Sequence, residues 1–216
     1  MNRTPRKQSG GPTYLHEDDM HQRGLGPVAG VDEAGRGPLA GPVVVAAVVL
    51  DRDQIPYGLN DSKKLTSASR EALFTNLLET ADVSIATASE NTIDTLNIRA
   101  ATLETMVRAV NGLSNPPAFV LVDGRDVPPP LVGRARALIG GDGASLSIAA
   151  ASICAKVVRD RIMVAMDALY SGYGFAQHKG YGTAEHLEAL TRLGPCALHR
   201  CSFAPVAKAR KGKSGI

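Results

Sequence analysis

The amino-acid sequence predicts an α/β domain built on a single sheet. Three observations support this: apolar runs of strand length, segments of helical periodicity between them, and glycine or proline at most of the boundaries. The clearest apolar run is Val-Val-Val-Ala-Ala-Val-Val-Leu at 43–50, whose β-branched residues and length are typical of a buried strand. Because strands alternate with helices along most of the chain, we expect helices to flank the sheet.

Five segments have the composition of strands. The first, 27–31, precedes a glycine-rich turn that leads into 43–50. Segment 83–89 alternates Val, Ile and Thr with smaller residues, which predicts a strand with one covered face. Segment 118–122 follows a Pro-Pro pair and is apolar throughout, and 134–139 is the last predicted strand.

Four segments have helical patterns. Residues 67–80 follow Thr66, a natural N-cap, and carry leucine and phenylalanine at helical spacing. Residues 91–110 form the second predicted helix. The third, 147–169, starts with a stretch that is apolar nearly all round, as expected of a helix packed against a sheet. The fourth is short and covers 183–193.

The length and the polar ends predict one domain with two tails. The chain has 216 residues, 44% of them hydrophobic, enough for one sizeable core, which we place at 27–206. Residues 1–26 contain almost nothing apolar and are expected to be a disordered tail. Residues 207–216 are expected to be a basic, disordered tail. A monomer is expected, because no exposed apolar stripe stands out.

The composition narrows the classes of protein. The net charge of +3 is compatible with binding nucleic acid but does not establish it. Aromatic residues make up only 4% and tryptophan is absent, which argues against a single-strand binder that works by stacking. No apolar run reaches the roughly 18 residues that span a membrane, and the N-terminus lacks a secretory segment, so we expect a cytoplasmic protein without a membrane partner. Three cysteines fit a reducing compartment.

Four acidic residues lie where apolar strands end. Asp32 and Glu33 follow the first strand, Asp123 follows the fourth, and Asp142 lies in the glycine turn after the fifth. Burying such carboxylates is costly unless a cation compensates, and a site of oxygen ligands without His or Cys suits Mg²⁺ or Mn²⁺. Two such ions about 4 Å apart would bracket a scissile phosphate. Since neighbouring strand residues face opposite ways, Asp32 and Glu33 can share a site only where the strand bends or ends.

A phosphate cradle is predicted beside these acids. Gly35, Arg36 and Gly37 combine backbone that can approach a ligand closely with a planar guanidinium. Lys63 and Lys64 precede a predicted helix N-terminus, which favours anions. Alternatively, the glycines form only a tight turn and the lysines only a solvated pair.

Three further features have both a functional and a structural interpretation. Tyr181 lies between glycines and offers a stacking surface for a sugar or base, although a loop tyrosine is more often half-buried packing. Asp160 lies four residues after Lys156 on a helix, so pairing of the two is favoured over metal binding. The cluster of Cys196, His199 and Cys201 lacks a paired Cys-x-x-Cys spacing, and a soft-metal site is not expected there.

Beyond these patterns, the chain resembles a known family, type 2 ribonuclease H, the bacterial ribonuclease HII. The resemblance covers essentially 28–206, with its motifs in the right order. The matching stretches are Val31-Asp32-Glu33-Ala34-Gly35-Arg36-Gly37-Pro38, Asp61-Ser62-Lys63-Lys64-Leu65, Val122-Asp123-Gly124, Gly141-Asp142, the segment 150–160, His178-Lys179-Gly180-Tyr181-Gly182-Thr183 and His199-Arg200-Cys201-Ser202-Phe203. It implies a ribonuclease-H-like fold, a five-stranded mixed sheet flanked by helices, with a C-terminal helical extension.

The resemblance also implies a reaction. The family hydrolyses the RNA strand of RNA–DNA hybrids and cuts on the 5′ side of single ribonucleotides in duplex DNA, leaving a 3′-hydroxyl and a 5′-phosphate. It implies that the four acids are catalytic metal ligands for Mg²⁺ or Mn²⁺. It further implies that the backbone of Gly35, Arg36 and Gly37 grips the ribonucleotide at its 2′-hydroxyl and that Tyr181 contacts the sugar at the RNA-to-DNA junction. Phosphate contacts from Arg36, Lys63 and Lys64 would add affinity without sequence preference.

Two other functions are kept as alternatives. One is a non-catalytic protein that binds duplexes through Arg36, the lysines and the basic tail. The other is the sister enzyme ribonuclease HIII, which is expected to carry an extra N-terminal substrate-binding domain, and 1–26 is too short for one. The sequence leaves open whether a replication clamp recruits the protein.

Overall fold

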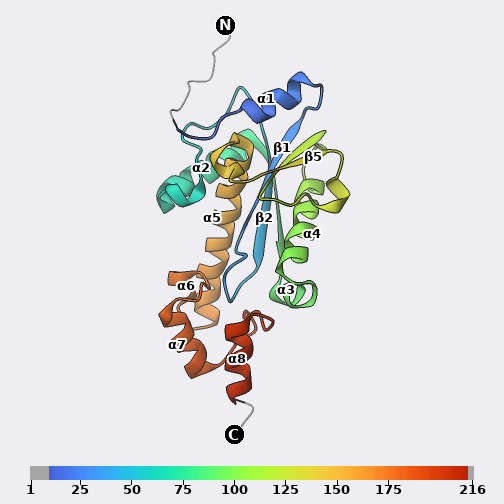
Figure 1. The fold of residues 1–216 in the computed structure, drawn as a ribbon. Helices are drawn as coiled ribbons and strands as arrows, with labels where there is room; N and C mark the ends of the chain where they lie inside the picture. The colour runs from blue at the N-terminus through green and yellow to red at the C-terminus, as the bar shows by residue number, and fades with distance from the viewer. Residues whose placement is uncertain (1–9, 214–216) are drawn as a thin grey trace.

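A mixed five-stranded sheet forms the centre of the computed structural model, which describes residues 10–213 (Figure 1). The strand order is β3-β2-β1-β4-β5. β1 pairs antiparallel with β2 and parallel with β4; β2 pairs antiparallel with β3, and β4 parallel with β5. The predicted mixed sheet is therefore confirmed. The strands are Val28–Ala34 (β1), Val43–Leu50 (β2), Ala81–Ala88 (β3), Phe119–Asp123 (β4) and Ala135–Leu138 (β5).

Helices cover both faces of this sheet (Figure 1). Val44, Ala46 and Val48 of β2 pack against α2 and α5, while Val45 and Ala47, which point the opposite way, pack against α4. α6, α7 and α8 form the C-terminal extension at one end of the molecule. The helices are Ser67–Thr80 (α2), Glu90–Leu96 (α3), Ile98–Asn111 (α4), Leu146–Leu169 (α5), Phe175–His178 (α6), Ala184–Leu193 (α7) and Ala204–Lys213 (α8). Within the described residues, none of the helices is both long and apolar enough to traverse a bilayer.

The predicted helix over 91–110 is divided in two. Asn97 adopts a left-handed backbone with φ of 69°, which ends α3, and its side chain then accepts a hydrogen bond from the N–H of Ala100. Asparagine tolerates this conformation and is also a favoured N-cap. Periodicity continues across the break, so the apolar pattern alone does not reveal it.

The prediction of disorder over 1–26 is wrong for the part that the structure describes. Residues Leu15–Gln22 form α1, which lies across one end of the sheet (Figure 1). Met20 is 3% exposed and packs with Val28 and Ile148. The carboxylate of Glu17 is buried and accepts hydrogen bonds from Ser145 and Ser147 at the start of α5. Residues 1–9 lie outside the described residues.

The predicted tail at 207–216 is also wrong over most of its length, because α8 continues to Lys213. Val206 is fully buried against Leu39 and Leu190, which fixes the start of this helix. The carboxylate of Asp94 accepts hydrogen bonds from the N–H groups of residues 201 and 202 just before it. Ordered structure is therefore found on both sides of the predicted 27–206 within the described residues; residues 214–216 lie outside the description.

Three short 3₁₀ turns lie in the described segments that connect the strands and helices. One of them, η1, carries the predicted lysine pair, and another, η3, carries Asp142. Both lie at the same end of the sheet as the last residues of β1 and β4, since η3 contacts β4 and both η1 and η3 contact α5. The 3₁₀ turns are Ser62–Lys64 (η1), Pro129–Leu131 (η2) and Gly141–Gly143 (η3).

Candidate active site

The parallel pairing of β1 and β4 brings two predicted acids together. Val31 is paired with Val122, so the next residue of each strand, Asp32 and Asp123, lies at the same end of two neighbouring strands. Asp32 is only 5% exposed, and its Oδ1 accepts a 2.7 Å hydrogen bond from the N–H of Glu33. Burial raises the pKa of Asp32 well above its ordinary value, and the charges of Glu33 and Asp123 raise it further.

Glu33 takes part in the same electrostatic cluster. Burial raises its pKa, Arg36 lowers it, and the charge of Asp123 raises it again. Nη1 of Arg36 lies 3.3 Å from Oε1 of Glu33. The expected strand end directly before Asp32 is not found, because both acids lie inside β1, which stays paired with β2 as far as Ala34. The chain leaves the sheet only at Gly35, whose φ is 99°, one residue after the strand ends.

Asp142 is joined to the cluster through the η3 turn. The N–H of Gly141 donates a 2.7 Å hydrogen bond to Oδ1 of Asp123, which ties the turn to the end of β4. Asp142 is 8% exposed; burial raises its pKa, and the charges of Asp61 and Asp123 raise it further. On the other side, Nζ of Lys63 lies 3.6 Å from Oδ2 of Asp142 and opposes this rise.

These four acids fit a divalent cation by charge and ligand chemistry. Three of them, Asp32, Glu33 and Asp142, have pKa values raised by burial, and the charge of Asp123 raises each of them further. A cation held among them would offset both the burial of the carboxylates and their mutual repulsion. In the described part of the chain, no three acidic, His or Cys side chains are already arranged to hold an ion. Arg36 and Lys63 hold outer oxygens of the cluster instead, and side-chain rotation would be needed to direct three carboxylates at one point.

The glycine-rich turn lies directly beside the acids. A Cβ atom on Gly35 would meet Nε of Arg159 at 2.0 Å, so only glycine fits there. Arg36 and Gly37 are exposed. A Cβ atom on Gly37 would lie 3.8 Å from the ring of Tyr181, which places that half-exposed ring over the turn. The structure therefore brings Tyr181 to the predicted cradle.

The two predicted lysines behave differently. Lys63 is at the site through its ion pair with Asp142. Lys64 is exposed, and none of the ion pairs found among residues 10–211 includes it. Asp160 pairs with Lys156 at 2.8 Å, as the favoured interpretation predicted.

Several side chains of the site escape the sequence patterns. Asp61, whose charge raises the pKa of Asp142 more than any other group does, accepts a hydrogen bond from the N–H of Lys63 and so shapes the η1 turn. The Ser152 side chain bonds Asp32, and its Oγ lies 2.9 Å from Oγ of Ser62. Asp61 does not end an apolar strand, and Ser152 lies in an apolar helix, so only their presence in matching motifs singles them out.

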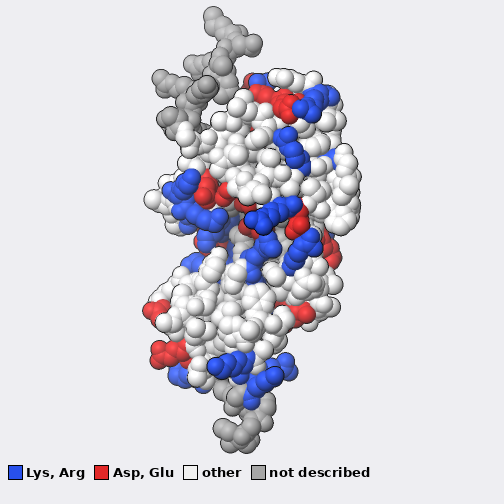
Figure 2. All heavy atoms as spheres, in the orientation of Figure 1, with Lys and Arg blue, Asp and Glu red and all other residues white. Residues whose placement is uncertain are grey.

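Charged side chains gather where the sheet meets the C-terminal extension. Figure 2 shows Lys and Arg mixed with Asp and Glu in a band across the middle of this face, at the level between the sheet and α6–α8. Such a band offers cations to a polyanionic backbone next to acids that can hold metal.

Acids that repel one another, with arginine and lysine side chains beside them, suit the metal-dependent hydrolysis of a phosphodiester bond. The fold and the site therefore define the chain as a nuclease of that class. Residues 29–206 match the family of ribonuclease HII. The chain belongs to the ribonuclease HII family.

Curated relatives and solved structures agree with this. Ribonuclease HII of Agrobacterium fabrum is 56% identical over 196 residues, 91% of this chain and 90% of that protein. Ribonuclease HII of Rhizobium meliloti is 58% identical over 194 residues, 90% of each. The structure is similar to ribonuclease H2 from Pyrococcus horikoshii OT3, with a TM-score of 0.73 and 29% identity, covering 88% of this chain and 99% of that one.

Two further solved structures share the fold. Archaeoglobus fulgidus ribonuclease HII, solved in complex with PCNA, has a TM-score of 0.71 and 28% identity, covering 85% of this chain and 96% of that one. Bst-RNase HIII, solved with Mn²⁺, has a TM-score of 0.68 and 22% identity, which shows likeness of fold alone, over 98% of this chain and 76% of that one. The chain is a divalent-metal-dependent ribonuclease H that hydrolyses the RNA of RNA–DNA hybrids and cuts at single ribonucleotides embedded in DNA.

Proposed function

We propose that Asp32, Glu33, Asp123 and Asp142 hold two Mg²⁺ or Mn²⁺ ions at the end of β1 and β4. The observation that carries the proposal is the raised pKa of three of these acids in one buried cluster. When bound, two such ions would activate the attacking water and stabilise the leaving 3′-oxygen. Cleavage on the 5′ side of the ribonucleotide then leaves a 3′-hydroxyl and a 5′-phosphate.

Recognition of the ribonucleotide is assigned to the turn next to the acids. Arg36 and Gly37 are exposed there, and their backbone N–H groups donate to no acceptor among the described residues, so they are free to bind the 2′-hydroxyl, the group that distinguishes RNA from DNA. Gly35 allows the turn to approach, and Tyr181, over Gly37, would stack on the sugar at the RNA-to-DNA junction.

The remaining cations contact the phosphate backbone. Arg36 and Lys63 both lie within ion-pair distance of an acid of the cluster, so they are positioned to exchange that acid for a substrate phosphate once the acids hold metal. Lys64, exposed beside Lys63, would add a second phosphate contact.

The test uses a duplex of DNA that carries one ribonucleotide, labelled at either end, with Mg²⁺ or Mn²⁺. We expect one cut, 5′ of the ribonucleotide, whose upstream product can be extended by a DNA polymerase because it ends in a 3′-hydroxyl. A cut on the 3′ side, or products with 2′,3′-cyclic phosphate, would contradict the proposed assignment. Preference for a long hybrid over the single ribonucleotide would favour the ribonuclease HIII alternative.

Assembly and location are proposed from the same chemistry. A monomer can carry the whole site, because all four acids and the turn come from one chain. The enzyme would work in the cytoplasm, where a bacterial chromosome supplies ribonucleotide-containing duplex DNA. Sedimentation at micromolar concentration should give the mass of one chain, 22.6 kDa.

A further inference from the structure

Two arginine side chains are buried beneath the glycine-rich turn. Arg159 comes from α5 and Arg200 from the segment before α8, and they are 1% and 0% exposed. In the described part of the chain neither guanidinium forms an ion pair; each is satisfied by backbone carbonyl oxygens. Burying a charge without a counter-ion is costly, so this arrangement calls for an explanation beyond filling space.

Arg200 uses its whole guanidinium on the turn. Nε and Nη2 both donate to the carbonyl of Gly41, at 2.9 and 2.7 Å. Nη2 also donates to the carbonyl of Gly35 at 2.6 Å, and Nη1 donates to those of Arg36 and Pro38 at 3.0 and 2.8 Å. One side chain therefore fixes four carbonyl groups between residues 35 and 41.

Arg159 joins this turn to the segment that carries Tyr181. Its Nη2 donates to the carbonyls of Ala40 and Lys179, at 3.2 and 3.0 Å, and its Nε donates to that of Pro42 at 3.1 Å. Its guanidinium carbon also lies 5.8 Å from the centre of the Tyr181 ring. The two walls of the proposed ribonucleotide notch thus share one buried cation.

The carbonyl contacts decide which way the peptide groups of the turn face. Carbonyls of residues 35, 36, 38 and 41 point inward to Arg200, and the exposed N–H groups of Arg36 and Gly37 donate to no acceptor among the described residues. A peptide unit is nearly planar, so turning one end inward turns its N–H outward. The result is a pair of free donors, the N–H groups of Arg36 and Gly37, with fixed positive charge below them; the N–H of Leu39 is already used by the carbonyl of Gly180, and residue 42 is a proline.

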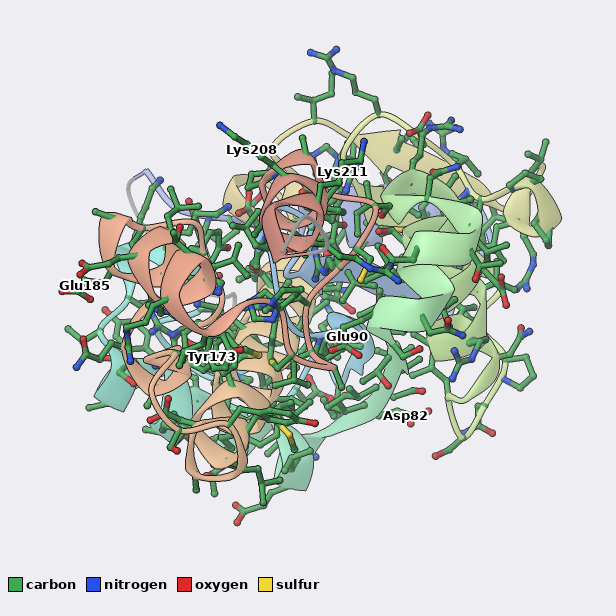
Figure 3. The ribbon with its side chains drawn as sticks, turned by 90° about the horizontal axis from the view of Figure 1, so that it is seen from below. Asp82, Glu90, Tyr173, Glu185, Lys208 and Lys211 are labelled. Carbon is green, nitrogen blue, oxygen red and sulfur yellow. The ribbon has the colours of Figure 1, made fainter. Side chains whose placement is uncertain are left out.

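The largest opposing charge on Arg200 comes from Glu90, the first residue of α3, followed by Asp94. On Arg159, Tyr181 and Asp160 contribute more than Glu90 does. Figure 3 shows Glu90 near the centre of this end of the molecule, whereas Glu185 lies at its edge. Burial raises the pKa of Glu90, and the charges of Arg200 and Arg159 act against that rise. Burial, and then the charge of Arg159, lower the pKa of Arg200 to about 10, so it remains charged at neutral pH.

We propose that Arg159 and Arg200 are positioning residues for ribonucleotide recognition: they hold the 35–42 turn so that the N–H groups of Arg36 and Gly37 face the substrate, and they place positive charge beneath its phosphate. The inference rests on the proposed function of Gly35, Arg36 and Gly37. It extends that function to two residues that touch neither the substrate nor the metal ligands. Because Arg200 lies in the C-terminal extension, this extension would also contribute to the selection of ribonucleotides.

The decisive variant is Arg200→Lys, which keeps the charge but loses the fork that bonds four carbonyls. We expect KM for a duplex with one ribonucleotide to rise about 10-fold or more, since a displaced turn loses contacts that only a fixed geometry provides. Mn²⁺ binding measured by calorimetry should stay within twofold of wild type, because the acids are untouched. The matched control is Arg161→Lys, two residues after Arg159 on α5, whose side chain pairs with Glu71 at the surface.

A second variant keeps the test independent of folding. Glu90→Gln removes the compensating negative charge at a half-buried surface position, and it should lower KM about 2-fold at low salt, an effect that shrinks as salt rises. A role of the arginines in packing alone predicts an unchanged KM. If Arg200→Lys fails to fold, the Glu90→Gln result decides.

The outcomes separate this inference from the proposed function. Suppose that the wild-type protein cuts the duplex and that folded Arg200→Lys has a KM within twofold of wild type. This result would overturn the role of the arginine pair and leave the ribonuclease assignment intact. An unchanged KM in Glu90→Gln would likewise overturn the claim that the buried positive charge of the arginines attracts the substrate phosphate. Wild-type protein that does not cut at all would refute the proposed function, and this inference with it.

Discussion

The backbone N–H of Gly141 donates a 2.7 Å hydrogen bond to Oδ1 of Asp123, so one carboxylate of the site holds the turn that carries the next. Asp142 lies one residue further on. The relationship has a practical consequence: Asp123 has both a charge and a structural acceptor, and a substitution can remove one without the other.

Asp123→Asn should abolish cleavage and keep the fold. Its amide oxygen can still accept from Gly141, while the loss of a charged metal ligand should lower kcat on the ribonucleotide-containing duplex by more than ~100-fold, since even partners of metal ligands cost 10–100-fold. The measurement is single-turnover cleavage beside binding of the same duplex by fluorescence anisotropy. Retained cleavage would support the alternative of a non-catalytic duplex binder whose activity comes from a contaminant.

Asp32→Asn is expected to stabilise the metal-free protein. Burial raises the pKa of Asp32 well above its ordinary 3.8, so ionisation of this carboxyl costs more in the folded than in the unfolded state, and stability is lost as pH rises from the ordinary value through the raised one. At pH 7.5 in chelator, the variant should melt a few degrees higher, about 1 kcal/mol for a domain of this size. The advantage should shrink as pH falls toward 4.

The same pair of proteins provides the control. Mg²⁺ should raise the melting temperature of the wild type more than that of Asp32→Asn, because the ion relieves a repulsion that the variant already lacks. A variant that melts lower than wild type in chelator at pH 7.5 would refute the claim that the charge of Asp32 destabilises the metal-free fold, because the Asn amide oxygen can still accept from the N–H of Glu33.

The features that could be predicted from the sequence are those that depend on short stretches of the chain. Apolar runs locate all five strands, and the acids at their ends locate the site, because strand ends and buried charges follow from short stretches of sequence. Asp32 and Asp123 meet only through parallel pairing of strands that lie far apart in the chain, which the resemblance to a known fold supplied.

The missed part depends on distant contacts. α1 has a weak apolar face, and its order comes from Glu17, whose partner Ser147 is 130 residues away. Arg200 bonds carbonyls 159 to 165 residues earlier, and no local pattern marks an arginine for burial. Asn97 divides a helix whose periodicity is unbroken, because a left-handed residue leaves the apolar spacing on either side intact.

Glu17→Ala should destabilise the protein by about 2–4 kcal/mol. Glu17 accepts from the hydroxyls of Ser145 and Ser147 and from the N–H of Ser147, so the change leaves buried donors at the start of α5 unpaired. Chemical unfolding in urea measures the loss. Leu15→Ala, 68% exposed on the same helix, is the matched control and should change stability by less than ~0.5 kcal/mol. Equal effects of the two substitutions would show that α1 contributes only its helicity.

The buried histidines predict a loss of stability in mild acid. Nε2 of His199 lies 3.1 Å from Nε2 of His186, whose Nδ1 lies 2.9 Å from the carbonyl of Tyr181, while Nδ1 of His199 accepts from the N–H of Cys196. Only one pair of tautomers satisfies these contacts: His186 donates through Nδ1 and accepts at Nε2 from the proton of His199. Both rings are therefore neutral in the fold.

Burial, and then the neighbouring His186, lower the pKa of His199 from 6.5 to about 4. Between pH 6.5 and 4, His199 is therefore protonated in the unfolded chain and neutral in the folded one. The contribution of neutral His199 to the free energy of unfolding is thus fully present above about pH 6.5, and it is lost as pH drops toward 4. We expect the melting temperature to fall by several degrees between pH 7.5 and 5, and His199→Gln to reduce this slope because Gln does not titrate. His21→Gln, at an exposed position, should leave the slope unchanged. Equal slopes in wild type and His199→Gln would show that other groups cause the acid sensitivity.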